Sequence, residues 1–262
     1  MKNSLKLLLS SALLLTLAAC QGQDVATLNL EGGDNIVGGS KVSSWSDLSK
    51  HVLSILTGPG ERIQICTAVL IRDNIALTAA HCVYQKNKIR IAYGVDLYEQ
   101  GNEIPVDKVV IHELYGGPGS GRNDLALIRI AGNLPRKYKP VALPSVADTP
   151  YQGQELITVG YGRTGWMKGA ENDGRLRQVA VNVDSTDMNK IWIGRSNGKG
   201  ICQGDSGGPT FLKKNGEYYP IGIASYILMM SDDPAKKCLE GGVLMNVVSY
   251  LPWIHQNLPS LN

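Results

Sequence analysis

The sequence lacks several features that would assign it to a functional class directly. Its formal net charge is only +3 and its lysines and arginines form no run, which argues against nucleic acid as a partner. It contains neither an internal repeat nor a low-complexity segment. Beyond the N-terminal region, no apolar run is long enough to span a bilayer. With 262 residues, 43% of them hydrophobic, the chain can still bury a large core, so we expect a folded protein with room for two sub-domains.

Residues 1–20 predict an export signal. A largely apolar stretch, Leu7–Ala19, follows two lysines and is too short to cross a membrane as a stable helix. The segment ends in Leu17-Ala18-Ala19-Cys20, which resembles the lipobox of bacterial lipoproteins, where the cysteine is lipidated and becomes the new N-terminus. The alternative is an ordinary signal peptide with a cysteine at its boundary. We expect an exported lipoprotein, anchored to the bacterial envelope through Cys20.

Cysteine is scarce, and its use follows from export. An exported protein matures in an oxidising compartment, where thiols pair. When Cys20 is set aside, Cys66, Cys82, Cys202 and Cys238 remain. Four cysteines allow three pairings. Of these we favour the local one, which joins Cys66 to Cys82 and Cys202 to Cys238.

The remaining chain reads as β structure. Residues 21–35 are polar and predict a tether. After them, short β-prone runs alternate with turn residues, and the 30 glycines add to a pattern typical of all-β sandwiches or barrels. A passage with four prolines marks a boundary between two β sub-domains, about 36–140 and 150–247, and a helix is expected over Val248–Leu258. The predicted strands are Ile63–Ile71, Ile75–Thr78, Lys88–Tyr93, Val106–Ile111, Leu125–Ile130, Glu155–Tyr161, Arg177–Val183, Pro209–Leu212, Tyr218–Tyr226 and Gly242–Val247.

Ser206 is the candidate nucleophile, because the segment GDSGGP places glycines on both sides of it and leaves its hydroxyl accessible. A serine hydroxyl is weakly nucleophilic and needs a neighbouring base that a carboxylate orients. Of the four histidines, only His81 has a suitable setting, in TAAHC at the end of a predicted strand. Asp124, in NDLALI, opens an apolar strand, so we expect it to be buried beside a hydrogen-bonding partner.

The segments TAAHC, NDLALI and GDSGGP together resemble the chymotrypsin-like serine proteases, and they occur in that family's order of His, Asp, Ser. The resemblance covers residues 36 to about 258 and makes 36–262 a peptidase domain. It implies two six-stranded antiparallel β-barrels with the active site between them and a C-terminal helix. It also implies that Ser206 is the nucleophile, His81 the general base and acid, and Asp124 the residue that orients His81. The backbone N–H groups of Gly204 and Ser206 would form the oxyanion hole.

Two other interpretations are open. The segment GDSGG also matches the G-x-S-x-G elbow of α/β-hydrolases, with Asp232 and His255 as possible partners of Ser206. That fold requires alternating strands and helices before the serine, and the sequence predicts strands there. A protease fold that only binds its partner is the second alternative, although such proteins usually lose part of the triad.

The segment Ile36-Val37-Gly38-Gly39 predicts a zymogen. In the family that it resembles, this motif begins the mature enzyme, and the new ammonium group pairs with the acid before the catalytic serine, which is Asp205 here. Cleavage after Asn35 would therefore order the loop that carries Gly204. No cysteine lies between residues 21 and 35, so the same cleavage would release the catalytic domain from Cys20. We expect a separate activating protease.

Substrate specificity follows from positions that line the P1 pocket in the family. Gly200 stands where trypsins have an aspartate, and Ser225 matches the family's serine beside the buried aspartate. Tyr226 replaces the usual tryptophan, an aromatic for an aromatic, and Ile227 replaces a common glycine. Together with Gly242 they predict small or medium apolar P1 residues. The alternative is preference for Arg or Lys, with Glu240 supplying the negative charge.

No cofactor or metal is expected. The segment Glu99–Glu103 only faintly matches the calcium loop of the family. We expect a monomer that acts on protein or peptide substrates. Because His81 must be neutral to act as a base, the rate should fall below roughly pH 7.

Overall fold

The computed structural model describes residues 36–58, 63–98, 102–165, 174–194, 198–233 and 236–262. The predicted export signal with Cys20, the tether, and part of Glu99–Glu103 lie outside the described residues. All described residues belong to one compact unit, Gly33–Asn262. Among them, no helix combines the length and the apolar character that crossing a membrane requires.

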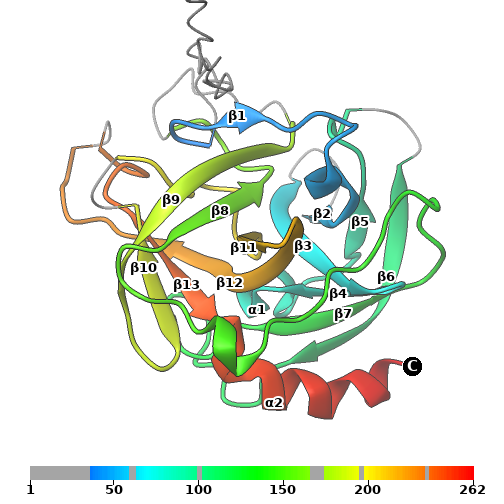
Figure 1. Ribbon diagram of the computed structural model, residues 1–262. Coiled ribbons are helices and arrows are strands. Elements are labelled where there is room, and N and C mark those ends of the chain that lie inside the picture. Colours follow the sequence, from blue (N-terminus) through cyan, green and yellow to red (C-terminus); the bar gives the residue numbers. More distant parts are fainter. Residues whose placement is uncertain (1–35, 59–62, 99–101, 166–173, 195–197, 234–235) are drawn as a thin grey trace, which may run out of the picture. The chain divides into compact units, whose positions relative to one another are not determined.

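Six antiparallel strands close the first barrel (Figure 1). In barrel order they are β2 (Val52–Thr57), β3 (Gln64–Arg72), β4 (Ile75–Thr78), β7 (Ala126–Ile130), β6 (Glu103–Ile111) and β5 (Arg90–Ala92). Leucine, isoleucine and valine side chains from these strands contribute a large part of the main hydrophobic core, which also includes residues of α2 and of the second barrel. Every residue of β2 and β4 is buried, so the chain covers both faces of these two strands.

The second barrel also has six antiparallel strands (Figure 1). They are β8 (Glu155–Gly160), β9 (Arg177–Thr186), β10 (Lys190–Ile193), β13 (Gly242–Asn246), β12 (Glu217–Ile227) and β11 (Pro209–Lys214), and the ring closes because β8 pairs with both β11 and β9. The short strand β1 (Ser40–Lys41) adds to β9. Along β9, buried Arg177, Val179 and Val181 alternate with more exposed residues, which is the two-residue period of a strand.

Short helices complete the fold. The single turn α1 (Ala80–Val83) follows β4, and α2 (Val247–Asn257) follows β13. Three 3-10 turns are η1 (Asp47–Lys50), η2 (Val146–Asp148) and η3 (Leu258–Leu261). The side chain of Asn246 caps α2 by accepting the backbone N–H of Val248 over 3.2 Å. Tyr250 and Trp253 then bury one face of α2 in the main core.

The predicted fold class is confirmed: the chain is all-β, with two six-stranded barrels and a C-terminal helix. The sequence did not predict β1, β2 and β10. In β2 (VLSILT) a polar residue follows every two apolar ones, without strict alternation, and β1 and β10 have only two and four residues, so none of the three gives a clear two-residue period. The structure contains the two local disulfides, Cys66–Cys82 and Cys202–Cys238. The first joins β3 to α1, and the second joins the segments that precede β11 and β13.

Candidate active site

Ser206 lies in a tight turn between Cys202 and β11. The turn is held by the backbone N–H of Asp205, which donates to the carbonyl of Cys202 over 3.1 Å, and by that of Gly208, which donates to the carbonyl of Asp205 over 2.8 Å. Gly207 has a φ of +79°, and a Cβ there would lie 2.1 Å from the hydroxyl oxygen of Thr78. The residue after Ser206 must therefore be glycine, for both conformation and space.

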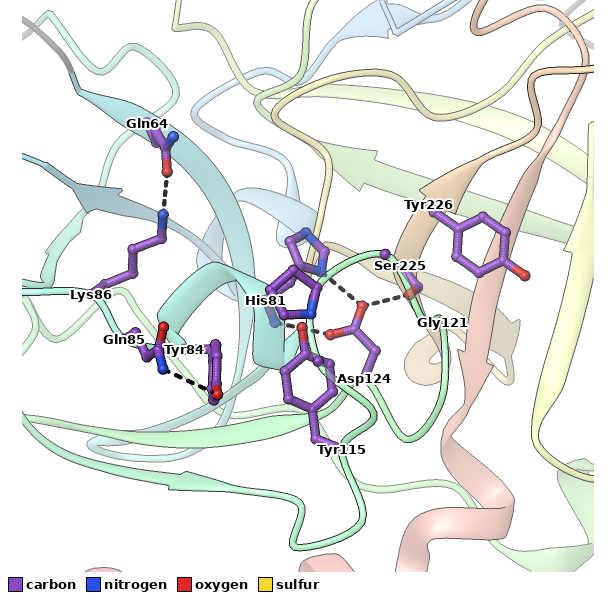
Figure 2. A pocket seen from close by; sticks show the side chains of 13 residues that line it. Gln64, His81, Tyr84, Gln85, Lys86, Tyr115, Gly121, Asp124, Ser225 and Tyr226 are labelled. Carbon is purple, nitrogen blue, oxygen red and sulfur yellow. Dashed lines mark hydrogen bonds and ion pairs between the residues drawn. The ribbon is translucent and has the colours of Figure 1, made fainter.

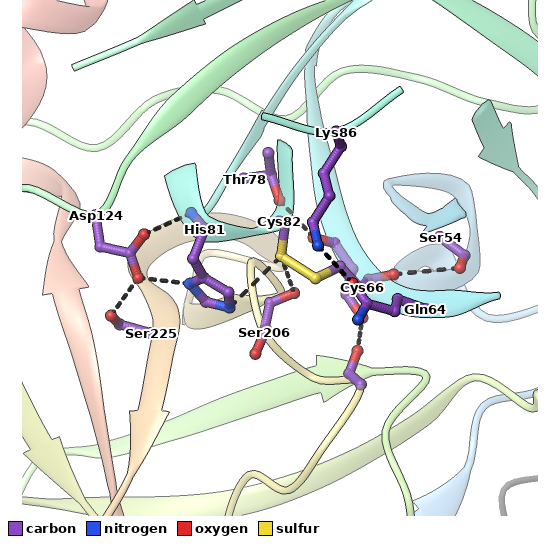
Figure 3. Close-up of a disulfide and its surroundings, with 12 residues drawn as sticks. Ser54, Gln64, Cys66, Thr78, His81, Cys82, Lys86, Asp124, Ser206 and Ser225 are labelled. Carbon is purple, nitrogen blue, oxygen red and sulfur yellow. Dashed lines mark hydrogen bonds and ion pairs between the residues drawn. A yellow bond between two sulfur atoms is a disulfide. The ribbon is translucent and has the colours of Figure 1, made fainter. Parts of the chain in front are cut away.

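His81 and Asp124 are hydrogen-bonded to each other. The Nδ1 atom of His81 lies 2.7 Å from one carboxylate oxygen of Asp124, and the backbone N–H of His81 donates to the other over 2.9 Å (Figure 3). The hydroxyl of Ser225 also donates to Asp124, over 2.5 Å. His81 is presented by α1 and Asp124 by the segment before β7, so the first barrel supplies both residues. Three hydrogen bonds thus fix the carboxylate and the orientation of the imidazole.

Asp124 is ionised despite its burial. Only 3% of the surface of Asp124 is exposed to solvent. Burial alone would raise its pKa, but the hydrogen bonds from His81 and Ser225 and the charge of His81 outweigh burial and hold the pKa below its usual value. A carboxylate that is buried, ionised and bonded to Nδ1 leaves the other ring nitrogen, Nε2, to accept a proton.

The other ring nitrogen faces the segment of Ser206. His81, Ser206 and Gly204 line one pocket of about 370 Å³, together with the Cys66–Cys82 disulfide. The Nε2 atom of His81 lies 3.7 Å from the sulfur of Cys82 (Figure 3). Among the described residues, the Ser206 hydroxyl makes no hydrogen bond with this Nε2 atom. Catalytic hydrogen bonds of this kind are often long or misaligned until a substrate is bound.

Two backbone donors border the same pocket. Within the described part of the chain, the N–H groups of Gly204 and Ser206 donate to no other residue, although most neighbouring N–H groups do. Gly204 has a φ of +100°, and a Cβ there would lie 2.9 Å from the α-carbon of Gly162. Both N–H groups are therefore available to an external acceptor such as a carbonyl oxygen.

Asp205 is buried behind this turn. Its carboxylate accepts the backbone N–H groups of Cys202 and Gly162, each over 2.8 Å. Burial raises its pKa to about 7, although these two bonds and the charge of Arg177 act in the opposite direction. Ile36 is also fully buried and packs in the hydrophobic core of the second barrel.

A second pocket, of about 470 Å³, is also lined by His81, together with Asp124 (Figure 2). Tyr115 and Tyr226 provide aromatic walls, and Tyr226 packs so closely on Gly121 that a Cβ there would lie 2.5 Å from its ring. Burial raises the pKa of Tyr115 to about 12, so its hydroxyl remains protonated and can donate. The pocket gives a peptide room beside the candidate triad.

The residues predicted to line the P1 pocket lie near one another in the second barrel. Gly242 pairs with Ile227 across β12 and β13, and a Cβ on Gly242 would lie 2.5 Å from the side chain of Ile201. The backbone N–H of Gly200 donates to the carbonyl of Val37 over 3.3 Å. Ile201 directly follows Gly200 in the chain but was not among the pocket residues predicted from the sequence. Both Ile201 and Ile227 therefore border the predicted P1 pocket.

The carboxylate of Glu240 is engaged elsewhere. It accepts the backbone N–H groups of Met230 and Ser231 in the loop after β12. Because this carboxylate binds two backbone N–H groups of its own loop, the structure does not support the alternative in which Glu240 pairs with Arg or Lys at P1.

The α/β-hydrolase alternative is wrong. All pairings between the described strands are antiparallel, and Asp232 and His255 are exposed on a loop and on α2. Among the described residues, one group has a spacing that could suit a metal ion: Cys66, His81 and Cys82. The two cysteines are joined in a disulfide, so they cannot act as thiolate ligands.

Comparison with known proteins gives the family. Residues 36–254 match the family model described as Trypsin. Kallikrein-8 of Mus musculus is 31% identical over 215 residues, which cover 76% of this chain and 78% of the relative. Chymotrypsin-like elastase family member 1 of Rattus norvegicus is 28% identical over 243 residues, 86% of this chain and 90% of the relative. Coagulation factor XI of Bos taurus is 27% identical over 91% of this chain, which spans only 40% of that protein. The chain belongs to the trypsin family and is a serine-type endopeptidase.

Proposed function

We propose that the chain hydrolyses peptide bonds through an acyl-enzyme formed on Ser206. His81 takes the proton of the Ser206 hydroxyl while the Ser206 oxygen attacks the carbonyl carbon of the substrate. The carbonyl oxygen becomes an oxyanion and accepts the N–H groups of Gly204 and Ser206. His81 then gives the proton to the leaving amine, and the C–N bond breaks. Water, deprotonated by His81, cleaves the resulting ester and regenerates Ser206.

One observation carries this proposal: the buried Asp124 carboxylate bonds both the ring and the backbone of His81, beside the turn of Ser206. An ionised carboxylate at Nδ1 keeps the proton on that nitrogen and stabilises the imidazolium that forms during the reaction. The two unbonded N–H groups in the turn of Ser206 support the second half of the mechanism, because they offer an oxyanion two preorganised donors.

A serine-directed fluorophosphonate tests the mechanism. The processed protein should be labelled at Ser206, and Ser206→Ala should not be labelled. Ser225→Ala serves as a second variant, since its hydroxyl is buried and donates to Asp124, so it should keep the label on Ser206. Folded wild-type protein that neither reacts nor cleaves peptides would favour the alternative of a protein that only binds its partner.

We further propose that cleavage between Asn35 and Ile36 activates the chain. The burial of Ile36 and the raised pKa of Asp205 support this proposal. Ionising an isolated buried carboxylate is unfavourable, and a new ammonium group on Ile36 would supply its counter-charge. Without that charge, the ionised carboxylate of Asp205 is unfavourable in its buried position at neutral pH, and this destabilises the turn that carries Gly204. Precursor with Asn35 replaced by a residue that the activating protease does not accept should remain inactive.

The P1 pocket is proposed to accept small or medium apolar side chains such as Ala, Val or Leu. The position of Ile201 and Ile227 beside Gly242 supports this preference, because two branched side chains narrow the space and neither carries a charge. Peptide substrates that differ only at P1 would measure it. A clear preference for Arg or Lys would contradict it.

We propose export, with the precursor held on the membrane through lipid on Cys20 and released by cleavage before Ile36. The two disulfides support export, since such bonds persist in oxidising compartments. Detergent-phase partitioning of intact and processed protein tests the release. The precursor should enter the detergent phase and the active form the aqueous phase. Active enzyme that stays with the detergent would contradict release.

A further inference from the structure

Thr67 of β3 makes two hydrogen bonds with the turn of Ser206. It is fully buried in the first barrel, while the turn belongs to the second. Its backbone N–H donates to the carbonyl of Ser206 over 2.8 Å. Its hydroxyl donates to the carbonyl of Gly204 over 2.9 Å and accepts the backbone N–H of Tyr161 over 3.2 Å. One residue of the first barrel therefore holds two peptide groups of the turn.

The direction of the hydroxyl bond is fixed by its partners. A threonine hydroxyl has one proton to donate, and a backbone N–H cannot accept it. Because Tyr161 offers an N–H and Gly204 offers a carbonyl, the proton of Thr67 must point to Gly204. Both partners are buried or half-buried, so neither has water as an easy substitute.

The position of Gly204 gives this bond its importance. The peptide that carries the Gly204 N–H is held by the N–H of Arg163, which donates to the carbonyl of Gln203 over 2.7 Å. The peptide that carries the Ser206 N–H is held by Gly208, which donates to the carbonyl of Asp205 over 2.8 Å. The peptide between these two joins Gly204 to Asp205. Its N–H donates to the carbonyl of Cys202 over 3.1 Å, within the turn itself, and its carbonyl accepts the hydroxyl of Thr67, which comes from the first barrel.

We propose that Thr67 is a positioning residue for the oxyanion hole. Its hydroxyl sets the angle between the two peptide groups whose N–H donors face the pocket, and so keeps both available to one oxygen atom. Thr67 acts through Gly204 and touches no reacting atom. The inference rests on the serine-peptidase chemistry of the family and on the proposed oxyanion donors, and it is independent of the P1 preference and of activation.

The packing around Thr67 supports a fixed position. Its own carbonyl accepts the hydroxyl of Thr78 over 2.8 Å. A Cβ on Gly207 would lie 2.4 Å from the carbonyl oxygen of Thr67, and one on Gly208 would lie 3.1 Å from its Cβ. The glycines after Ser206 thus let the turn approach Thr67 closely enough for these bonds to form.

The test compares Thr67→Val, which keeps the shape and removes the hydroxyl, with Thr67→Ser, which keeps the hydroxyl. Thr158→Val is the matched control, because Thr158 is a buried threonine of β8 whose hydroxyl bonds Thr210 and not the turn. For each processed protein we would measure kcat, KM and the affinity for a peptide aldehyde, whose adduct with Ser206 places an oxyanion in the hole. Melting temperatures report stability separately.

We expect Thr67→Val to lower kcat roughly 10- to 100-fold, less than the roughly 100- to 1,000-fold that losing an oxyanion donor costs. KM should stay unchanged, aldehyde affinity should fall with kcat, and Thr67→Ser should restore both. Thr158→Val should lower the melting temperature without changing kcat. A Thr67→Val protein with wild-type kcat, or one whose losses match those of Thr158→Val, overturns the proposal.

Should Thr67→Val fail to fold, Thr67→Ala and Thr67→Ser decide the question, since both are smaller than threonine and only one has a hydroxyl. Equal kcat in these two variants would overturn the proposal, and a lower kcat for Thr67→Ala supports it. A wild-type enzyme whose Ser206→Ala variant still cleaves peptides would refute the proposed mechanism instead, so the two failures are distinguishable.

Discussion

Gly162 donates its backbone N–H to the carboxylate of Asp205 over 2.8 Å, and a Cβ on Gly162 would lie 2.3 Å from that carboxylate. Gly162 follows β8, and Asp205 directly precedes Ser206. Gly160 approaches the same carboxylate, with a Cβ position 2.3 Å from one of its oxygens. The lack of side chains at these two glycines creates the space in which Asp205 is buried.

Gly162→Ala should therefore displace the turn of Ser206. The added methyl group overlaps the carboxylate, and overpacking of this kind costs about 1–3 kcal/mol. A displacement of about 1 Å near the reacting atoms lowers reactivity about 100-fold. We expect a lower melting temperature and slower fluorophosphonate labelling. Gly132→Ala is the control, since its Cβ would meet only the side chain of Ile104, at 3.2 Å. Wild-type labelling of Gly162→Ala would show that the turn does not depend on this space.

The uncleaved precursor should lose stability as the pH rises from about 4 to about 7. Burial raises the pKa of Asp205 from 3.8 to about 7, so the folded state binds a proton that the unfolded state has released. Stability contributed by this group is full below the unfolded pKa and is lost as the pH rises through the folded one. The shift corresponds to roughly 4 kcal/mol. After cleavage, the Ile36 ammonium would favour the ionised carboxylate and remove this loss.

Melting temperatures of precursor and processed protein, measured from pH 4 to pH 8, check this prediction. Asp205→Asn is neutral at every pH, so the precursor with this substitution should show a flatter profile. Precursor and processed protein that respond alike to pH would contradict the proposed role of Ile36 as counter-charge.

The candidate site gives a stronger signal in the sequence than some of the strands around it. His81, Asp124 and Ser206 occur in segments whose composition is specific, whereas β2 (VLSILT) has a composition that any buried segment can have. Ile201 and Thr67 were missed for a different reason. Both are ordinary residue types whose importance comes from contacts between segments far apart in the chain, such as the contact between Thr67 and Gly204, which are 137 positions apart. Only the folded chain brings them together.

Asp124→Asn should lower kcat by roughly 10⁴-fold, because an amide can stabilise the wrong tautomer of His81 and carries no charge to support the imidazolium. In the wild type, hydrogen bonds from His81 and Ser225 hold the pKa of Asp124 low, so its ionised carboxylate stabilises the fold above the ordinary pKa of aspartate and less at lower pH. Asp124→Asn removes this contribution to stability. Kinetics and melting temperature at neutral pH measure both effects. Asp73→Asn, at an exposed position, is the control. Retention of wild-type kcat by Asp124→Asn would rule out its role beside His81.

Ile227→Gly should shift the P1 preference toward larger side chains. Ile227 ends β12, is half-buried against the core of the second barrel, and pairs with Gly242. Removing its side chain opens space next to Gly242 without adding charge, so kcat/KM for Phe at P1 should rise relative to Val by roughly tenfold or more. Leu212→Gly is the matched control, because Leu212 packs on the same core from β11. It should lower the melting temperature and leave the ratio of the two substrates unchanged. If the ratio responds equally to both variants, or to neither, Ile227 does not form the wall of the pocket, and the size of the P1 residue must be limited by Ile201 or by another group.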